Sequence, residues 1–179
     1  MVPSAYDAYL TAVATAAAAL IGLLFVAVSV RDDTIFGPNA IPGGEALAIS
    51  AFSGLANSFV VSLLGLIPQV NIGEPAVAMA VLSLISTIRL QRRLHYGRSP
   101  VVVAITFAAY LAQLAYGVLL IAHPHDSDDV INLSYIVFTT LVMSLERAWS
   151  LLRGKHVAAA QASAAPGGDD PQPGSGPDR

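Results

Sequence analysis

The chain has 179 residues, of which 55% are hydrophobic, 12% are charged and none is cysteine. Soluble domains contain about 25% charged residues, so this composition indicates a membrane protein. The lack of cysteine excludes disulfides, thiolate nucleophiles and cysteine-ligated zinc or iron–sulfur sites. The formal net charge of −3 does not indicate a surface that binds nucleic acid, so we expect no nucleic acid among the partners.

The first apolar run covers about residues 8–30 and contains no charged side chain. It is long enough to cross a hydrocarbon core about 30 Å thick. No Lys or Arg precedes it and Arg31 follows it, which is unlike a cleavable signal peptide. The run therefore predicts an uncleaved helix with its N-terminus outside. Its small residues Ala14, Ala18 and Gly22 recur at the four-residue spacing of closely packed membrane helices.

Four more apolar stretches follow, separated by short polar or Gly- and Pro-rich segments. The third stretch is the weakest, because it has only 14 residues, 75–88, before Arg89. This stretch is long enough to cross a membrane if the side chains of the arginines that follow it extend to the membrane interface. If it crosses, those arginines lie on the same side of the membrane as Arg31. The expected spans are about 8–30, 46–68, 75–94, 100–122 and 130–152.

All nine Lys and Arg residues fall on one side of this five-span arrangement, and four of them lie within 89–98. Basic loops stay in the cytoplasm. The sequence therefore predicts an all-α, polytopic transmembrane helix bundle with five spans, N-terminus outside and C-terminus inside. We expect residues 1–156 to form the bundle. Residues 157–179 are poor in large apolar side chains and predict a disordered cytoplasmic tail.

Polar side chains recur along the second, fourth and fifth predicted spans, some of them near mid-depth. In the second span, Ser50, Gly54, Ser58 and Ser62 repeat every four residues and Asn57 lies beside them. The polar residues of the fourth span share one helical face. They predict either a hydrated solute path or hydrogen bonds between packed helices, and the sequence leaves both open. The candidates are Ser50, Gly54, Asn57, Ser58, Ser62, Thr106, Tyr110, Gln113 and Thr139.

Glu146 is the single acidic residue within a predicted span, and it lies near the inner end of the fifth. Arg89, at the inner end of the short third span, is a candidate partner for it. We expect a structural ion pair at the inner leaflet, with gating or contact with lipid headgroups as alternatives.

No motif predicts catalysis or a cofactor. The chain has no Gly-x-Ser-x-Gly, no His-Glu-x-x-His, no phosphate-binding loop and no dinucleotide fingerprint, and no predicted span contains His or Asp. The predicted outer loop carries His123, His125 and Asp126, which are weak candidates for a divalent ion or for sensing pH. We expect a solvated loop there, with no bound metal, no cofactor and no enzymatic activity.

The stretch AAAALIGLLFVAVS at 16–29, with a second helix ending in Leu66-Ile67-Pro68, resembles a group of small, uncharacterised bacterial multi-spanning inner-membrane proteins. The resemblance covers the first two predicted helices. It implies a multi-pass helical protein of the bacterial cytoplasmic membrane. It implies no activity, and no functional residue transfers from it.

Two functions fit these observations. The first is a non-enzymatic structural or regulatory subunit, or a modulator of a membrane complex, that acts in the lipid bilayer by forming a homo-oligomer or by binding other membrane proteins. The alternative is a small oligomeric channel or carrier whose polar path follows the second and fourth spans. Replacing Asn57 and Gln113 with apolar residues separates the two, because only a channel has flux to lose.

Overall fold

The computed structural model describes residues 4–30, 44–68, 70–93, 100–123 and 127–164. A short 3-10 helix, η1 (Ser4–Tyr6), precedes α1 (Asp7–Val30), α3 (Gly44–Gly65), α4 (Gly73–Arg93), α5 (Pro100–Ala122) and α6 (Ser127–Ala164). Each of these five α-helices is long and apolar enough to cross a membrane. The predicted all-α class and the five candidate spans, including the short third one, are confirmed for the described part of the chain.

Two helix ends differ from the expected boundaries. Helix α3 stops at Gly65, three residues before the predicted end at Pro68, because proline disturbs the turn that precedes it. Helix α6 continues through Ala164, beyond the predicted start of the tail at residue 157, since its last eight residues include five alanines, the best helix former. Residues 165–179 of the expected tail lie outside the described residues.

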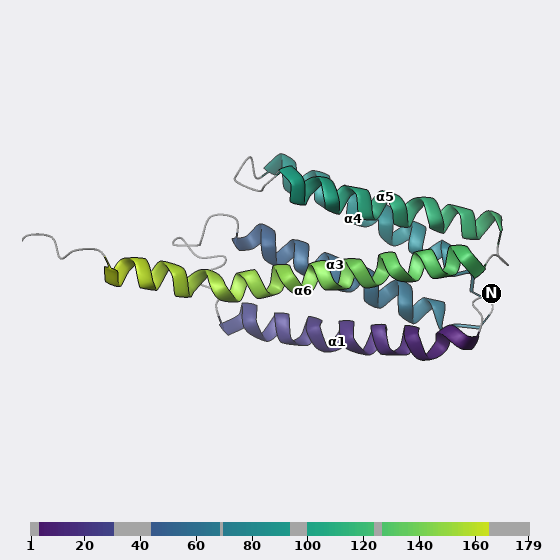
Figure 1. Ribbon diagram of the computed structural model, residues 1–179, viewed down its shortest axis with the longest axis horizontal. Coiled ribbons are helices and arrows are strands. Elements are labelled where there is room, and N and C mark those ends of the chain that lie inside the picture. Colours follow the sequence, from purple (N-terminus) through teal and green to yellow (C-terminus); the bar gives the residue numbers. More distant parts are fainter. Residues whose placement is uncertain (1–3, 31–43, 69, 94–99, 124–126, 165–179) are drawn as a thin grey trace, which may run out of the picture.

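Helices α3, α4, α5 and α6 form a four-helix ring in which each helix packs against two antiparallel neighbours, α3 on α4, α4 on α5, α5 on α6 and α6 on α3. The backbones of the diagonal pairs α3–α5 and α4–α6 do not approach each other closely within the described residues. Helix α1 packs outside this ring, against α3 and α6. Figure 1 shows α1 along one side, α4 and α5 along the other, and α3 and α6 between them.

The ring has two unlike ends. At one of them α1 and α4 finish while α3 and α5 begin, and this end carries Arg89, Arg92 and Arg93 of α4. Helix α6 passes this end and projects beyond the bundle, as Figure 1 shows, taking Arg153 and Lys155 with it. We call it the arginine end.

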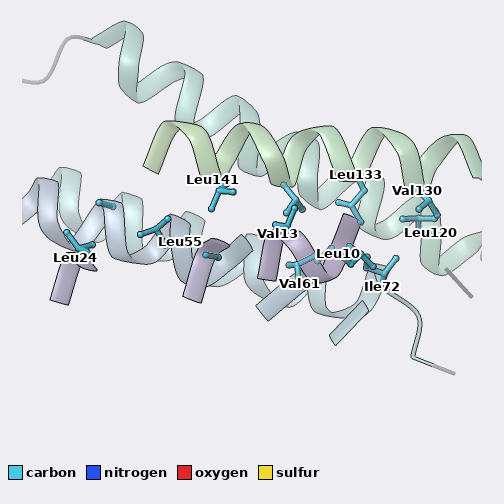
Figure 2. Close-up of a cluster of buried hydrophobic side chains, with 14 residues drawn as sticks. Leu10, Val13, Leu24, Leu55, Val61, Ile72, Leu120, Val130, Leu133 and Leu141 are labelled. Carbon is cyan, nitrogen blue, oxygen red and sulfur yellow. The ribbon is translucent and has the colours of Figure 1, made fainter. Parts of the chain in front are cut away.

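The apolar core lies mainly where α1 meets α3 and α6, and it extends to the opposite end of the ring. Figure 2 shows its labelled members, which are Leu10, Val13, Leu24, Leu55, Val61, Ile72, Leu120, Val130, Leu133 and Leu141. All of them are buried. Lipid tails are as apolar as leucine, so within a membrane these contacts stabilise the fold through van der Waals packing and not through removal from water.

The turn between α3 and α4 anchors the start of α4 to α5. The Asn71 side chain accepts a hydrogen bond from the Gly73 amide at 3.0 Å, as a helix cap does, and donates to the Leu120 carbonyl at 2.9 Å. The two helix backbones then meet at Gly73 and Gly117. A Cβ atom on Gly73 would lie 2.5 Å from the Gly117 carbonyl oxygen, so only glycine allows this approach.

We predict that Gly73→Ala destabilises the protein by about 1–3 kcal/mol, because the added methyl group meets backbone that has no rotamer to change. Gly22→Ala is the matched control, since nothing lies within 4 Å of a Cβ atom at that position. This control should be neutral or slightly stabilising, because alanine is the better helix former. Denaturant unfolding of both variants in detergent micelles measures the difference, and equal stabilities would contradict the close approach of α4 and α5.

Candidate functional site

The centre of the ring contains a closed pair of amide side chains. Asn57 donates to the Gln113 side-chain oxygen at 2.9 Å, and Gln113 donates back to the Asn57 side-chain oxygen at 2.9 Å. Gln113 also donates to the Ala76 carbonyl at 3.0 Å, so the pair ties α3, α5 and α4 together. Both side chains are fully buried. We call this arrangement the amide clasp, and it joins two helices that lie diagonally across the ring.

The clasp lies well inside the bundle. Asn57 is 13 residues from the start of α3 and 8 residues from its end. At 1.5 Å per residue these separations correspond to about 20 Å and 12 Å. The sequence places Asn57 and Gln113 at mid-depth but does not predict their mutual pairing, which depends on which helices face each other across the ring.

The four-residue ridge of α3 packs along α6. Gly54 lies against Ser144 so closely that a Cβ atom at Gly54 would overlap the Ser144 hydroxyl, and Ser58 donates to the Val137 carbonyl at 3.2 Å. Ser62 is buried, and its hydroxyl has no hydrogen-bond partner within the described residues. The ridge predicted from the sequence therefore serves helix packing along most of its length.

Toward the arginine end, the axis of the ring is occupied by a guanidinium group. Arg147 of α6 is only 8% exposed. It donates to the Ser50 hydroxyl of α3 at 2.8 Å and to the Thr106 hydroxyl of α5. Tyr110 of α5 is also a hydrogen-bond partner of Arg147, and the same tyrosine meets Ser83 of α4. We call these five side chains the arginine cluster, and it joins all four helices of the ring.

A small cavity of about 20 Å³ adjoins the arginine cluster between α3, α4 and α5. Three members of the cluster line it, namely Ser50, Thr106 and Tyr110. The remaining polar lining comes from Ser53, Ser86, Thr87 and Gln91. Its volume exceeds the roughly 10–15 Å³ that one water molecule needs. The cavity therefore has room for a water-sized polar group at the arginine end.

The larger hollows on the molecule are apolar and open to its surface. One of about 220 Å³ is lined by residues of α1, α3 and α6, including Leu24 and Trp149. Another of about 560 Å³ lies at the opposite end, between η1, α1 and α6, and contains Tyr9 and Tyr135. Surfaces of this kind suit lipid acyl chains or the side chains of another membrane helix.

Several sequence candidates lie elsewhere than in these clusters. Thr139 is exposed and donates to the Tyr135 carbonyl of its own helix at 2.7 Å. Arg89 and Glu146 are both exposed, and their helices α4 and α6 are not in direct contact within the described residues, so the structure does not bring this pair together.

The predicted metal candidates lie in the turn between α5 and α6. His123 is exposed, whereas His125 and Asp126 lie outside the described residues. Within the part of the chain that the structure describes, no three His, Cys, Asp or Glu side chains are close enough to hold a metal ion.

Sequence reasoning missed the inward direction of Arg147 and the buried Thr140 and Ser144 of the same helix. Besides Leu141, the buried residues of α6 are Val130, Leu133, Val137, Thr140, Ser144 and Arg147. They alternate between three- and four-residue steps, the spacing of a helix face that packs into a bundle. Extending this spacing from the apolar residues would have placed Arg147 inside and both Thr139 and Glu146 outside.

The arrangement offers hydrogen-bond donors and one positive charge, but no group that activates a nucleophile among the described residues. Its chemical capacity is to hold helices together and to stabilise a negatively charged or polar group near the arginine end. No protein-family model, curated protein or solved structure matches this chain.

We predict that the clasp stabilises the fold through coupling between its two amides. Asn57→Leu and Gln113→Leu should each destabilise the protein, because each removes the side-chain hydrogen-bond partner of the other amide in an apolar setting. The double variant should cost less than the sum of the two, with a coupling of about 0.6 to 2 kcal/mol. Unfolding in micelles of all four proteins measures this coupling.

Thr139→Ala is the matched control, since its hydroxyl bonds only to its own helix, and it should change the unfolding free energy by less than about 0.5 kcal/mol. Additive effects at Asn57 and Gln113 would show that their hydrogen bonds contribute nothing specific to the fold.

Proposed function

We propose that this chain is a multi-pass protein of the bacterial cytoplasmic membrane that acts by association and not by catalysis. Its N-terminus lies outside, and its arginine end lies in the cytoplasm. It forms a homo-oligomer, or it is a structural or regulatory subunit or modulator of a larger membrane complex. The clustering of Arg89, Arg92 and Arg93 at one end supports the orientation, because basic residues stay on the cytoplasmic side.

The amide clasp carries this proposal. A solute path through one chain has to pass Asn57 and Gln113, and these side chains are fully buried and hydrogen-bonded to each other in both directions. Toward the opposite end, the buried Leu120, Val130 and Leu133 follow. Polar residues at mid-depth that satisfy one another in this way are typical of helix packing.

The lipid-facing side of α1 supports association. Ala18 and Gly22 are exposed one turn apart, with open space around Gly22. Small residues at this spacing let the backbone of a second helix approach closely, which is the main source of helix association in lipid. Helix α1 lies outside the four-helix ring, so a partner reaches it without disturbing the arginine cluster or the clasp.

A channel or carrier is the second candidate, and one observation favours it. The polar cavity reaches from Gln91 at the arginine end as far as Tyr110, so one part of the ring axis is lined with hydroxyl groups. Transport then requires the clasp to open. We place this function second because the cavity gives no way around the clasp.

We predict that Gly22→Leu lowers the oligomer size of the purified protein or its co-purification with membrane partners, while leaving its unfolding free energy within about 1 kcal/mol of the wild-type value. The leucine side chain keeps a second helix at a distance, and a Cβ atom at this position has no atom of this chain within 4 Å. Particle mass in detergent, measured by light scattering, detects the change. Leu23→Val, at an exposed position about 100° around the same helix from Gly22, is the control that keeps the assembly intact.

The same preparations separate association from transport when they are placed in liposomes. Wild-type protein should leave the permeability to K⁺, chloride and glycerol equal to that of empty liposomes. Flux that the Asn57→Leu, Gln113→Leu double variant abolishes would favour the channel. Association fails as the explanation if Gly22→Leu changes neither particle mass nor partner recovery.

A further inference from the structure

Arg147 is a buried cation whose partners are all neutral. Its guanidinium donates to the hydroxyls of Ser50 and Thr106 and meets that of Tyr110. None of the carboxylates in the described part of the chain forms an ion pair with it. A charge removed from water within a membrane protein requires an opposite charge or a polar, hydrated site. The hydroxyls supply polar contacts but no negative charge.

Glu146 attracts Arg147 electrostatically, but it forms no direct ion pair with it. It directly precedes Arg147, so it points about 100° away around the helix, and its side chain is exposed. Glu45, near the start of α3, is also exposed. The other described carboxylates are Asp7, Glu74, Asp128 and Asp129, which lie at the end of the bundle opposite the arginine end.

The cavity is lined by the hydroxyl partners of Arg147 and not by Arg147 itself, and it has the chemistry of an anion site. Ser50 and Tyr110 belong both to the cavity wall and to the hydrogen-bond partners of the guanidinium. A Ser50 hydroxyl whose oxygen accepts from Arg147 keeps its hydrogen for a further acceptor. Ser53 and Ser86 add hydroxyl groups to the wall, and no carboxylate is among the described residues that line the cavity. Hydroxyl donors beside a fixed positive charge favour an anion over a cation.

The size and position of the cavity limit the ligand. A volume of about 20 Å³ holds a single atom somewhat larger than a water oxygen, and not a whole nucleotide or sugar. Gln91 lines the cavity and is exposed, and Arg89 and Arg92 are exposed in the same last turns of α4. These arginines raise the local concentration of anions at that end of the bundle.

We propose that Arg147 and the hydroxyl-lined cavity bind one singly charged anionic atom, which enters from the arginine end and completes the charge balance of the ring. A free halide and the phosphodiester oxygen of an anionic lipid share this chemistry, and experiment distinguishes the two sources. The site lies apart from the exposed face of α1, so the proposal stands whether or not the chain forms oligomers.

The test is thermal unfolding of the full chain in dodecyl maltoside, a detergent without charge or phosphate. In the first arm, chloride replaces gluconate at constant ionic strength. In the second, phosphatidylglycerol is added in chloride-free buffer. Ligand that binds only the folded protein raises the unfolding midpoint in a saturable way. A rise in the first arm identifies a free anion as the ligand, and a rise in the second alone identifies the lipid phosphodiester.

Three variants attribute the rise to this site. Arg147→Gln removes the charge, and Ser53→Val fills the cavity with methyl groups while leaving Arg147 and its three hydroxyl partners in place. Both variants should abolish the ligand-dependent rise in the unfolding midpoint. If Arg147→Gln does not fold, the result for Ser53→Val alone tests the site. Arg92→Gln, which removes an exposed arginine at the same end, should retain it. Absence of a saturable rise in the wild type in both arms, or a rise unchanged in Ser53→Val, would overturn the proposal.

Discussion

The reciprocal hydrogen bonds between Asn57 and Gln113 are the interaction on which the rest of this structure depends. A polar side chain deep in a bilayer has no water to bind, so it either finds a partner or weakens the fold. Here the partner lies across the diagonal of the four-helix ring, on a helix whose backbone does not adjoin that of α3 within the described residues. The long amide side chains fill the axis of the ring and bring α3 and α5 into register.

That register repeats toward the arginine end. The hydrogen-bonded Asn57 and Gln113 are 56 residues apart in the sequence. Two further pairs of neighbouring residues on α3 and α5 have the same separation. They are Gly54 with Tyr110, and Ser50 with Thr106, which both bind Arg147. The ring axis is consequently polar from the clasp to the arginine end, whereas buried apolar residues such as Leu120 and Leu133 close the opposite end. The ring therefore has a polar pocket at its arginine end only. A continuous pore would require Asn57 and Gln113 to move apart.

The sequence predicts the coarse architecture well, because span length and apolar composition are local properties. It indicates five membrane-length helices and places Asn57 and Gln113 at mid-depth. It does not predict the side-chain partners, because these depend on the rotation of each helix. Adjacent residues of α6 show the difference: Thr139 and Glu146 are exposed, while Thr140 and Arg147 face the axis. Pairing Glu146 with Arg89 by opposite charge neglected this rotation and the distance between α4 and α6.

The central claim, that the amide clasp closes the ring axis and leaves water access only from the arginine end, is tested most directly by cysteine accessibility along α4. The chain has no native cysteine, so each introduced thiol is the only one present. Gln91 lines the cavity and is exposed, whereas Ala80 and Ala76 are fully buried farther along α4, with Ala76 at the clasp. In liposomes treated with a charged, membrane-impermeant thiosulfonate, Gln91→Cys should react from the arginine end, and Ala80→Cys and Ala76→Cys should remain protected. Reaction of Ala76→Cys at a rate comparable to that of Gln91→Cys would contradict a closed clasp.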